Sequence, residues 1–132
     1  MCSSDLAKGR GADVAVCSIG PGIVGTGTRL GHGGLAAVTA ANAALALGGR
    51  PVVASRVSEA DTRERHRGVS HHTQAVLGLV LGDVAVGENG EGWQDACAGL
   101  ALSHMGRGPD QDPAFFEAAF AAGRTARQLV GC

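Results

Sequence analysis

Titratable and cationic side chains are concentrated in one short stretch of this sequence, RHRGVSHHTQ at residues 65–74. The rest of the chain is dominated by alanine, glycine and aliphatic residues. Guanidinium groups bind phosphates and carboxylates through paired hydrogen bonds. Imidazoles can donate hydrogen bonds, transfer protons near neutral pH and bind metal ions. The stretch therefore predicts a site for a small anionic molecule, with Arg65 and Arg67 as charged groups and His71 or His72 as the catalytic acid or base.

A second stretch, GPGIVGTGTRLGHGG at residues 20–34, contains seven glycines in fifteen positions. Its start fits the GxGxxG pattern of dinucleotide-binding loops. However, the acidic residue expected about 20 residues later is absent, and the further glycines postpone the helix, so we predict no dinucleotide site. A glycine-rich loop with threonine hydroxyls can still bind an oxyanion through its backbone amides. The alternative that stays open is a surface loop whose glycines serve sharp turns.

These two stretches are expected to share one cleft, because each follows a predicted strand and the carboxyl ends of parallel strands meet at one sheet edge. A third glycine-containing turn, at residues 103–113, would add its arginine to the same edge. The predicted binding positions are Gly20, Gly22, Gly25, Thr26, Gly27, Thr28, Arg65, Arg67 and Arg107, and no cofactor is identified. The alternative is a solvated loop of salt bridges with Glu59, Asp61 and Glu64, each of which would contribute little.

Histidines also raise the question of a metal site. Ser70 can cap a helix that starts at His71, which places His71 and His72 in the first turn, where the helix dipole favours neutral imidazole. Because adjacent helical residues diverge by about 100°, at most one of the two is expected to join His66 or His32 around a metal. We therefore assign no metal ligands, and a metal-dependent hydrolase using His66 with His71 or His72 stays an alternative.

Apolar runs and glycines predict a layered α/β domain with a mainly parallel sheet of three or four strands and helices packed on it. The expected strands are residues 12–19, 51–57, 83–87 and 100–104. The expected helices are residues 34–47, residues 71 to about 81, one or two turns at 93–98, and a last helix that begins at Asp112 and Pro113. The last helix would pack through Phe116 and Phe120. Strand, helix and strand over residues 12–57 would form a right-handed crossover.

With 132 residues and 45% hydrophobic content, the chain suits one domain, placed at residues 8–132 as a fragment of a larger α/β protein. Residues 1–7 are expected to be a non-native or disordered leader, since CSSDL resembles a translated sequencing adapter. The net charge of -1 disfavours nucleic-acid and membrane partners. Four cysteines without CxxC spacing are expected to be reduced thiols of a cytoplasmic protein. A non-catalytic assembly module, whose apolar helix at residues 35–47 packs against another subunit or against the missing upstream part of the same protein, is a further alternative.

Three segments resemble a known family: GPGIVGTGT, GGRPVVASRVSEADTRERHRGVSHHT and LSHMGRGPDQDPAFFEAAFAAGR. They are similar to a bacterial family known as domain of unknown function 3866, over residues 11–129. The resemblance implies that the chain is the carboxyl-terminal part of a protein more than twice as long, and it supplies no activity. The motif positions are Gly20, Gly22, Gly25, Gly27, Arg56, Arg65, His66, Arg67, His71, His72 and Arg107, without assigned roles. Between residues 87 and 100 this sequence departs from the family pattern, which puts the fourth strand in doubt.

Overall fold

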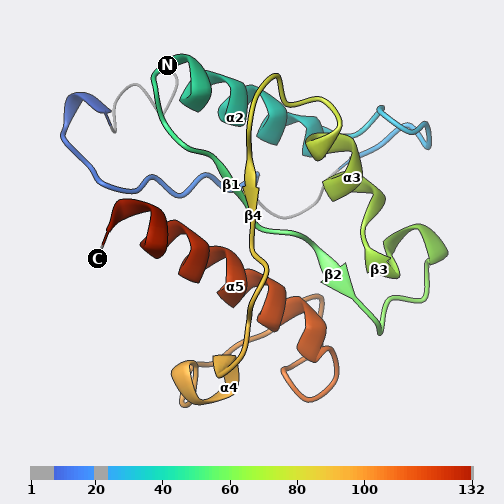
Figure 1. Cartoon of the computed structure of the whole chain (residues 1–132). Helices are drawn as coiled ribbons and strands as arrows, with labels where there is room; N and C mark the ends of the chain where they lie inside the picture. The colour runs from blue at the N-terminus through green and yellow to red at the C-terminus, as the bar shows by residue number, and fades with distance from the viewer. Residues whose placement is uncertain (1–7, 20–23, 132) are drawn as a thin grey trace.

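The computed structural model describes residues 8–19 and 24–131, which form a mixed α/β structure. Its elements are η1 (Gly33–Leu35), α2 (Ala36–Ala46), β1 (Val52–Val53), β2 (Val57–Ser58), η2 (Glu64–His66), β3 (Gly68–Val69), α3 (His71–Leu77), β4 (Ala85–Val86), α4 (Trp93–Ala96) and α5 (Pro113–Val130). Figure 1 shows β1 and β4 between the two long helices, α2 and α5. The predicted leader, Gly20, Gly22 and the thiols of Cys2 and Cys132 lie outside the described residues.

The described strands are short and form two separate two-stranded sheets. β1 pairs with β4 in parallel, and β2 pairs with β3 antiparallel. The predicted single sheet of three or four mainly parallel strands is therefore not observed. The expected strand at 51–57 is split into β1 and β2, because the amide of Arg56 donates to Thr73 Oγ1 of α3 at 3.0 Å instead of to a neighbouring strand.

Two predicted strands do not form. Residues 12–19 contain no strand and are exposed, Val16 by 92%, because a β-branched run needs neighbouring strands to be stable. At 100–104 the chain enters a tight turn in which an isolated antiparallel bridge joins His104 to Arg107 and Met105 takes a φ of 50°. The expected strand, helix, strand crossover over residues 12–57 is therefore wrong.

Helices agree better with the sequence, because their start and stop signals are local. α2 falls within the predicted 34–47, and Ala41 is its one buried residue, so most of this apolar helix is only partly covered. α3 begins at His71, and the Oγ of Ser70 accepts from the amide of His72 at 3.3 Å, which confirms the predicted cap. α3 ends before residue 81, since Gly78 follows its last turn. No helix of the described chain combines the length and the apolar character that crossing a membrane requires.

α5 packs on the strands through small residues and one aromatic ring. It starts at Pro113, as predicted, and its buried residues are Phe116, Ala121 and Ala122, whereas the predicted contact residue Phe120 is only half-buried. Trp93 of α4 stacks on Phe116 with ring centroids 6.0 Å apart.

The chain after β4 crosses α5 at very close range. A Cβ built on Gly87 would lie 2.3 Å from the amide nitrogen of Ala122 and 2.5 Å from the carbonyl carbon of Ala121. These are backbone atoms, which cannot rotate away as a side chain could. Only glycine therefore fits where β4 runs onto α5.

A buried carboxylate joins the loop after β2 to the start of α5. Asp112 stands at the predicted start of the last helix, but its side chain makes no capping hydrogen bond to α5. It accepts instead from Ser58 Oγ at 2.6 Å, from the amide of Glu59 at 3.2 Å and from Arg107 Nε at 3.3 Å. Burial raises the pKa of Asp112, but the hydrogen bonds and Arg107 outweigh burial, and the pKa is lowered overall.

A second buried carboxylate, Asp61, binds two arginines. Its side chain is 3% exposed and lies 2.7 Å from Arg56 Nη2 and 2.9 Å from Arg63 Nη2. The hydrogen bond from Arg63 is the largest cause of a pKa far below the usual range, and the bond from Arg56 adds to it against the effect of burial. Breaking a buried pair of this kind leaves an uncompensated charge.

We expect Gly87→Ala to destabilise the protein by about 1–3 kcal/mol or more, as overpacking does, because the new methyl group meets the backbone of α5. The matched control is Gly123→Ala on the same helix, where an added Cβ meets nothing within 4 Å. That control should stabilise the chain by about 0.5–1 kcal/mol, the helical advantage of alanine over glycine. Urea unfolding of the two variants measures both effects, and equal stabilities would contradict the close crossing.

Acid should destabilise the protein as Asp61 and Asp112 take up protons. Both pKa values are lower in the folded chain than the value of about 3.9 for an unfolded aspartate, so the folded state binds fewer protons. The stabilisation is therefore present above about pH 4 and is lost as the pH falls further.

Asp112→Asn should cost about 1–3 kcal/mol at pH 7, with a smaller difference from the wild type at pH 3. Asp110→Asn, at an exposed position, should follow the wild type. Urea unfolding from pH 7 to pH 3 tests this, and a difference that stays constant for Asp112→Asn would refute it.

Candidate functional site

The glycine-rich loop and the arginine-histidine stretch lie together around one hollow of about 110 Å³. Its lining residues are Gly25, Gly27, Thr28, Gly31, His32, Arg63, Arg65, His66, His71 and His72. The predicted meeting of the two stretches is thus observed, but its cause is different. No parallel strands bring them together among the described residues. Instead η1, at the end of the loop, packs against α3.

One wall of the hollow is a closed loop held by its own backbone. An isolated antiparallel bridge joins Gly25 to His32, and the amide of Thr26 donates to the carbonyl of Gly31 at 2.7 Å. Thr26 Oγ1 and Thr28 Oγ1 lie 3.0 Å apart and share a hydrogen bond. A Cβ on Gly31 would lie 1.9 Å from Thr26 Oγ1, so this turn requires glycine. Thr26 serves the loop itself, while Thr28 lines the hollow.

The opposite wall is the start of α3, where Ser70 fixes two histidines. Ser70 is fully buried, and its amide donates to the carbonyl of Arg56 at 2.8 Å. Its Oγ accepts from the amide of His72 and shares a 2.8 Å hydrogen bond with His66 Nδ1, whose direction depends on the tautomer. The residue that caps the helix therefore also holds the ring of His66.

Four histidines from three elements gather here. The ring of His32 lies 4.1 Å from that of His72 and 5.4 Å from that of His71, centroid to centroid, and His66 lies 4.9 Å from both His71 and His72. His32, His71 and His72 each offer one ligand atom, and these atoms lie within 4.8 Å of one another. The divergence of adjacent helical residues thus does not separate His71 from His72 as expected, because a ligand atom of each lies within 4.8 Å of the other and of His32.

The imidazoles of His66, His71 and His72 have lowered pKa values and are neutral at pH 7. Burial, followed by Arg63 and Arg56, lowers the pKa of His66 to about 4. Burial and the neighbouring histidines lower the pKa of His72 to about 4. Burial and then Arg65 lower the pKa of His71. Neutral imidazole can donate one hydrogen bond, accept a proton or bind a metal.

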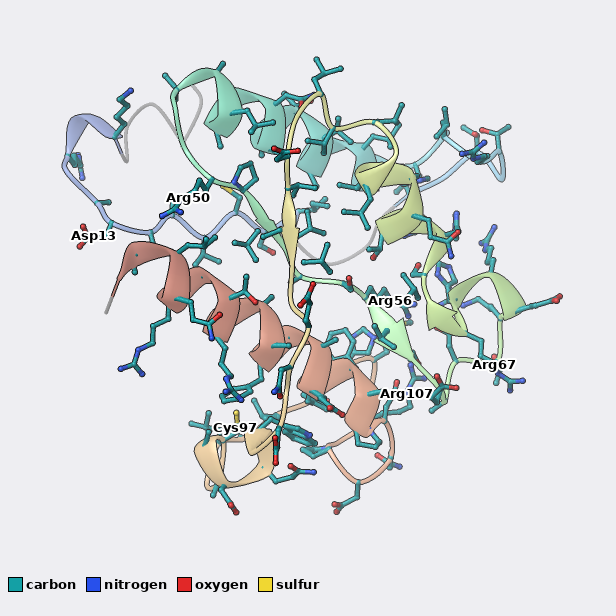
Figure 2. The ribbon with its side chains drawn as sticks, viewed as in Figure 1. Asp13, Arg50, Arg56, Arg67, Cys97 and Arg107 are labelled. Atoms are coloured by element: carbon teal, nitrogen blue, oxygen red, sulfur yellow. The ribbon has the colours of Figure 1, made fainter. Side chains whose placement is uncertain are left out.

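The arginines divide between two places. Arg65 lines the hollow, as does Arg63, which sequence reasoning did not include among the binding positions. Arg67 is exposed and does not line the hollow, and Arg107 is paired with Asp112 instead. Figure 2 shows Arg67 beside β3 and Arg107 beside the start of α5.

Four lining residues were missed as binding positions or considered only as metal partners: Gly31, His32, Arg63 and His66. A signal for Arg63 does exist in the sequence. A carboxylate two residues earlier can hold a guanidinium, and Asp61 Oδ1 accepts from both the amide and the Nε of Arg63 at 3.0 Å. Nothing in the sequence distinguishes Gly31 from the other glycines of its loop.

Comparison with known proteins agrees with the resemblance noted in the sequence. A family model described as "Protein of unknown function (DUF3866)" matches residues 5–88, which include both walls of the hollow. The match lies toward the amino-terminal end of this chain, so it does not support the expectation that only a carboxyl-terminal part is present. It also does not include the turn at 103–113. No curated protein and no solved structure matches the chain. Because the matched segment covers more than half of its residues, the chain belongs to the DUF3866 family, whose function is unknown.

Proposed function

We propose that this protein binds a small anion, a phosphate or carboxylate group, in the hollow between the glycine-rich loop and the start of α3. The observation that carries the proposal is the charge of the lining. Arg63 and Arg65 face the hollow, and no carboxylate is among the described residues that line it. Guanidinium groups lining a hollow whose described lining holds no carboxylate favour a negative ligand.

The size of the hollow limits the ligand. Pockets for drug-sized molecules are about 300–1,000 Å³, and this hollow holds about 110 Å³. A space of that volume accommodates an inorganic anion or the charged end of a larger molecule. It does not accommodate a whole dinucleotide, in agreement with the poor fit of the loop to that motif.

Each lining group has a distinct part in binding. Arg65 forms no ion pair in the described chain, so its charge is available to a ligand. Arg63 is held in place by Asp61, which lowers the entropy lost when a ligand binds. Thr28 offers a hydroxyl, and the neutral His71 and His72 offer hydrogen bonds. Either histidine could also accept a proton from a bound water, the catalytic role predicted from the sequence.

Arg65→Ala should weaken the binding of inorganic phosphate about tenfold to a hundredfold, the effect of losing a charged hydrogen bond. Arg67→Ala is the matched control, since this arginine lies two residues away on the same loop and does not line the hollow. The measurement is isothermal titration of phosphate into protein freed of metals on a chelating resin.

Acetate, titrated in the same way, distinguishes a preference for phosphate from a preference for carboxylate. If neither anion binds the wild type, or if Arg67→Ala weakens binding as much as Arg65→Ala, the hollow is not the anion site.

A further inference from the structure

We propose that His32, His71 and His72 bind one divalent transition-metal ion, with zinc as the best fit, inside the hollow. The three side chains come from the end of the glycine-rich loop and from the first turn of α3, and each offers one ligand atom within 4.8 Å of the others. The inference adds a resident metal to the proposed anion pocket, but its evidence and its test do not require the anion.

The first support is a group of buried nitrogens without partners. His32 is 8% exposed, yet neither of its ring nitrogens has a hydrogen-bond partner, and Nε2 of His71 has none either. Buried polar atoms in proteins are nearly always paired, and each one left unpaired costs about 1–3 kcal/mol. A metal ion bound between these rings would give one nitrogen of His32 and one of His71 a common partner.

The second support is the space that Gly34 leaves for the rings. A Cβ at this position would lie 2.7 Å from His32 Nδ1 and 3.1 Å from His32 Cε1, with His72 Cβ at 3.7 Å. Any side chain at residue 34 would therefore push His32 away from α3. The glycine allows the loop histidine to reach the two helical histidines.

The third support is the chemistry of the ligands. Imidazole nitrogen suits zinc, copper and nickel, whereas magnesium and calcium require oxygen ligands. Zinc binds histidine nitrogen at about 2.0–2.1 Å in tetrahedral geometry, which sets ligand atoms about 3.3 Å apart. The ligand atoms lie up to 4.8 Å from one another, so they would have to approach by about 1.5 Å to reach the zinc geometry. Rotation of the side chains can produce a movement of this size.

His66 is not part of this set, although the sequence alternative included it. Its Nδ1 is already hydrogen-bonded to Ser70 Oγ, and it does not belong to the group whose ligand atoms converge. His66 instead packs against the rings of His71 and His72. Three protein ligands leave a fourth position open, the arrangement of catalytic rather than structural zinc sites.

The test titrates Zn²⁺ into the metal-free full chain, in competition with a chromophoric chelator and without phosphate. We expect one equivalent to bind with micromolar affinity or better. His32→Ala and His72→Ala should each weaken binding about 100-fold or more, since even outer partners of metal ligands contribute 10–100-fold. His104→Gln is the control, because this histidine stacks on Phe115 away from the group.

Gly34→Ala keeps every histidine and should still weaken zinc binding at least about tenfold, as a displaced ligand would. Proton NMR of the imidazoles provides a second readout for variants of reduced stability, with the resonances of His32, His71 and His72 shifting on zinc addition and that of His104 unchanged. Absence of zinc binding to the wild type, or binding that survives His32→Ala, would overturn the proposal. Zinc binding without binding of either phosphate or acetate would leave this inference standing and reject the anion site. Anion binding without zinc binding would do the opposite.

Discussion

The arrangement of the site depends on one buried hydroxyl, that of Ser70 between β3 and α3. It caps the helix through the amide of His72, and it holds His66 through Nδ1, while the Ser70 amide connects to the carbonyl of Arg56. A residue without this oxygen would leave the amide of His72 and the Nδ1 of His66 without their partner. Each loss would cost about 1 kcal/mol or more. The hydroxyl that starts the helix at His71 therefore also holds the ring of His66.

A second constraint comes from the buried carboxylates, which decide which arginines remain available. Asp61 binds Arg56 and Arg63 together, and Asp112 binds Arg107. Without Asp61, two guanidinium groups would repel each other next to buried histidines. With it, Arg63 is fixed at the hollow and Arg65 stays unpaired there. The positive character of the hollow thus results from where the acids are placed, since the chain as a whole is close to neutral.

Local signals predicted the helices well, and non-local contacts explain most of what the sequence could not predict. The Ser70 cap and Pro113 mark helix starts by chemistry that neighbouring residues complete. A strand needs pairing with residues far along the chain, and residues 12–19 form no strand in the described structure, so the apolar pattern alone misled. The glycine-rich loop and the histidines were correctly expected to meet, although through η1 and α3 rather than a sheet edge. Arg107 was misplaced because its pairing with Asp112 depends on tertiary contacts.

The charge of the hollow makes its two proposed ligands depend on each other. A divalent ion held by three neutral imidazoles keeps its full charge, and Arg63 and Arg65 line the same space. Like charges repel, so the arginines oppose the metal and an anion offsets both, with coupling between two such sites of typically about 1–3 kcal/mol. Coupling of this size is reciprocal: a bound anion strengthens the metal site by the same factor by which the metal strengthens the anion site. Because no carboxylate is among the described residues that line the hollow, the fourth position of the metal stays open to an anion.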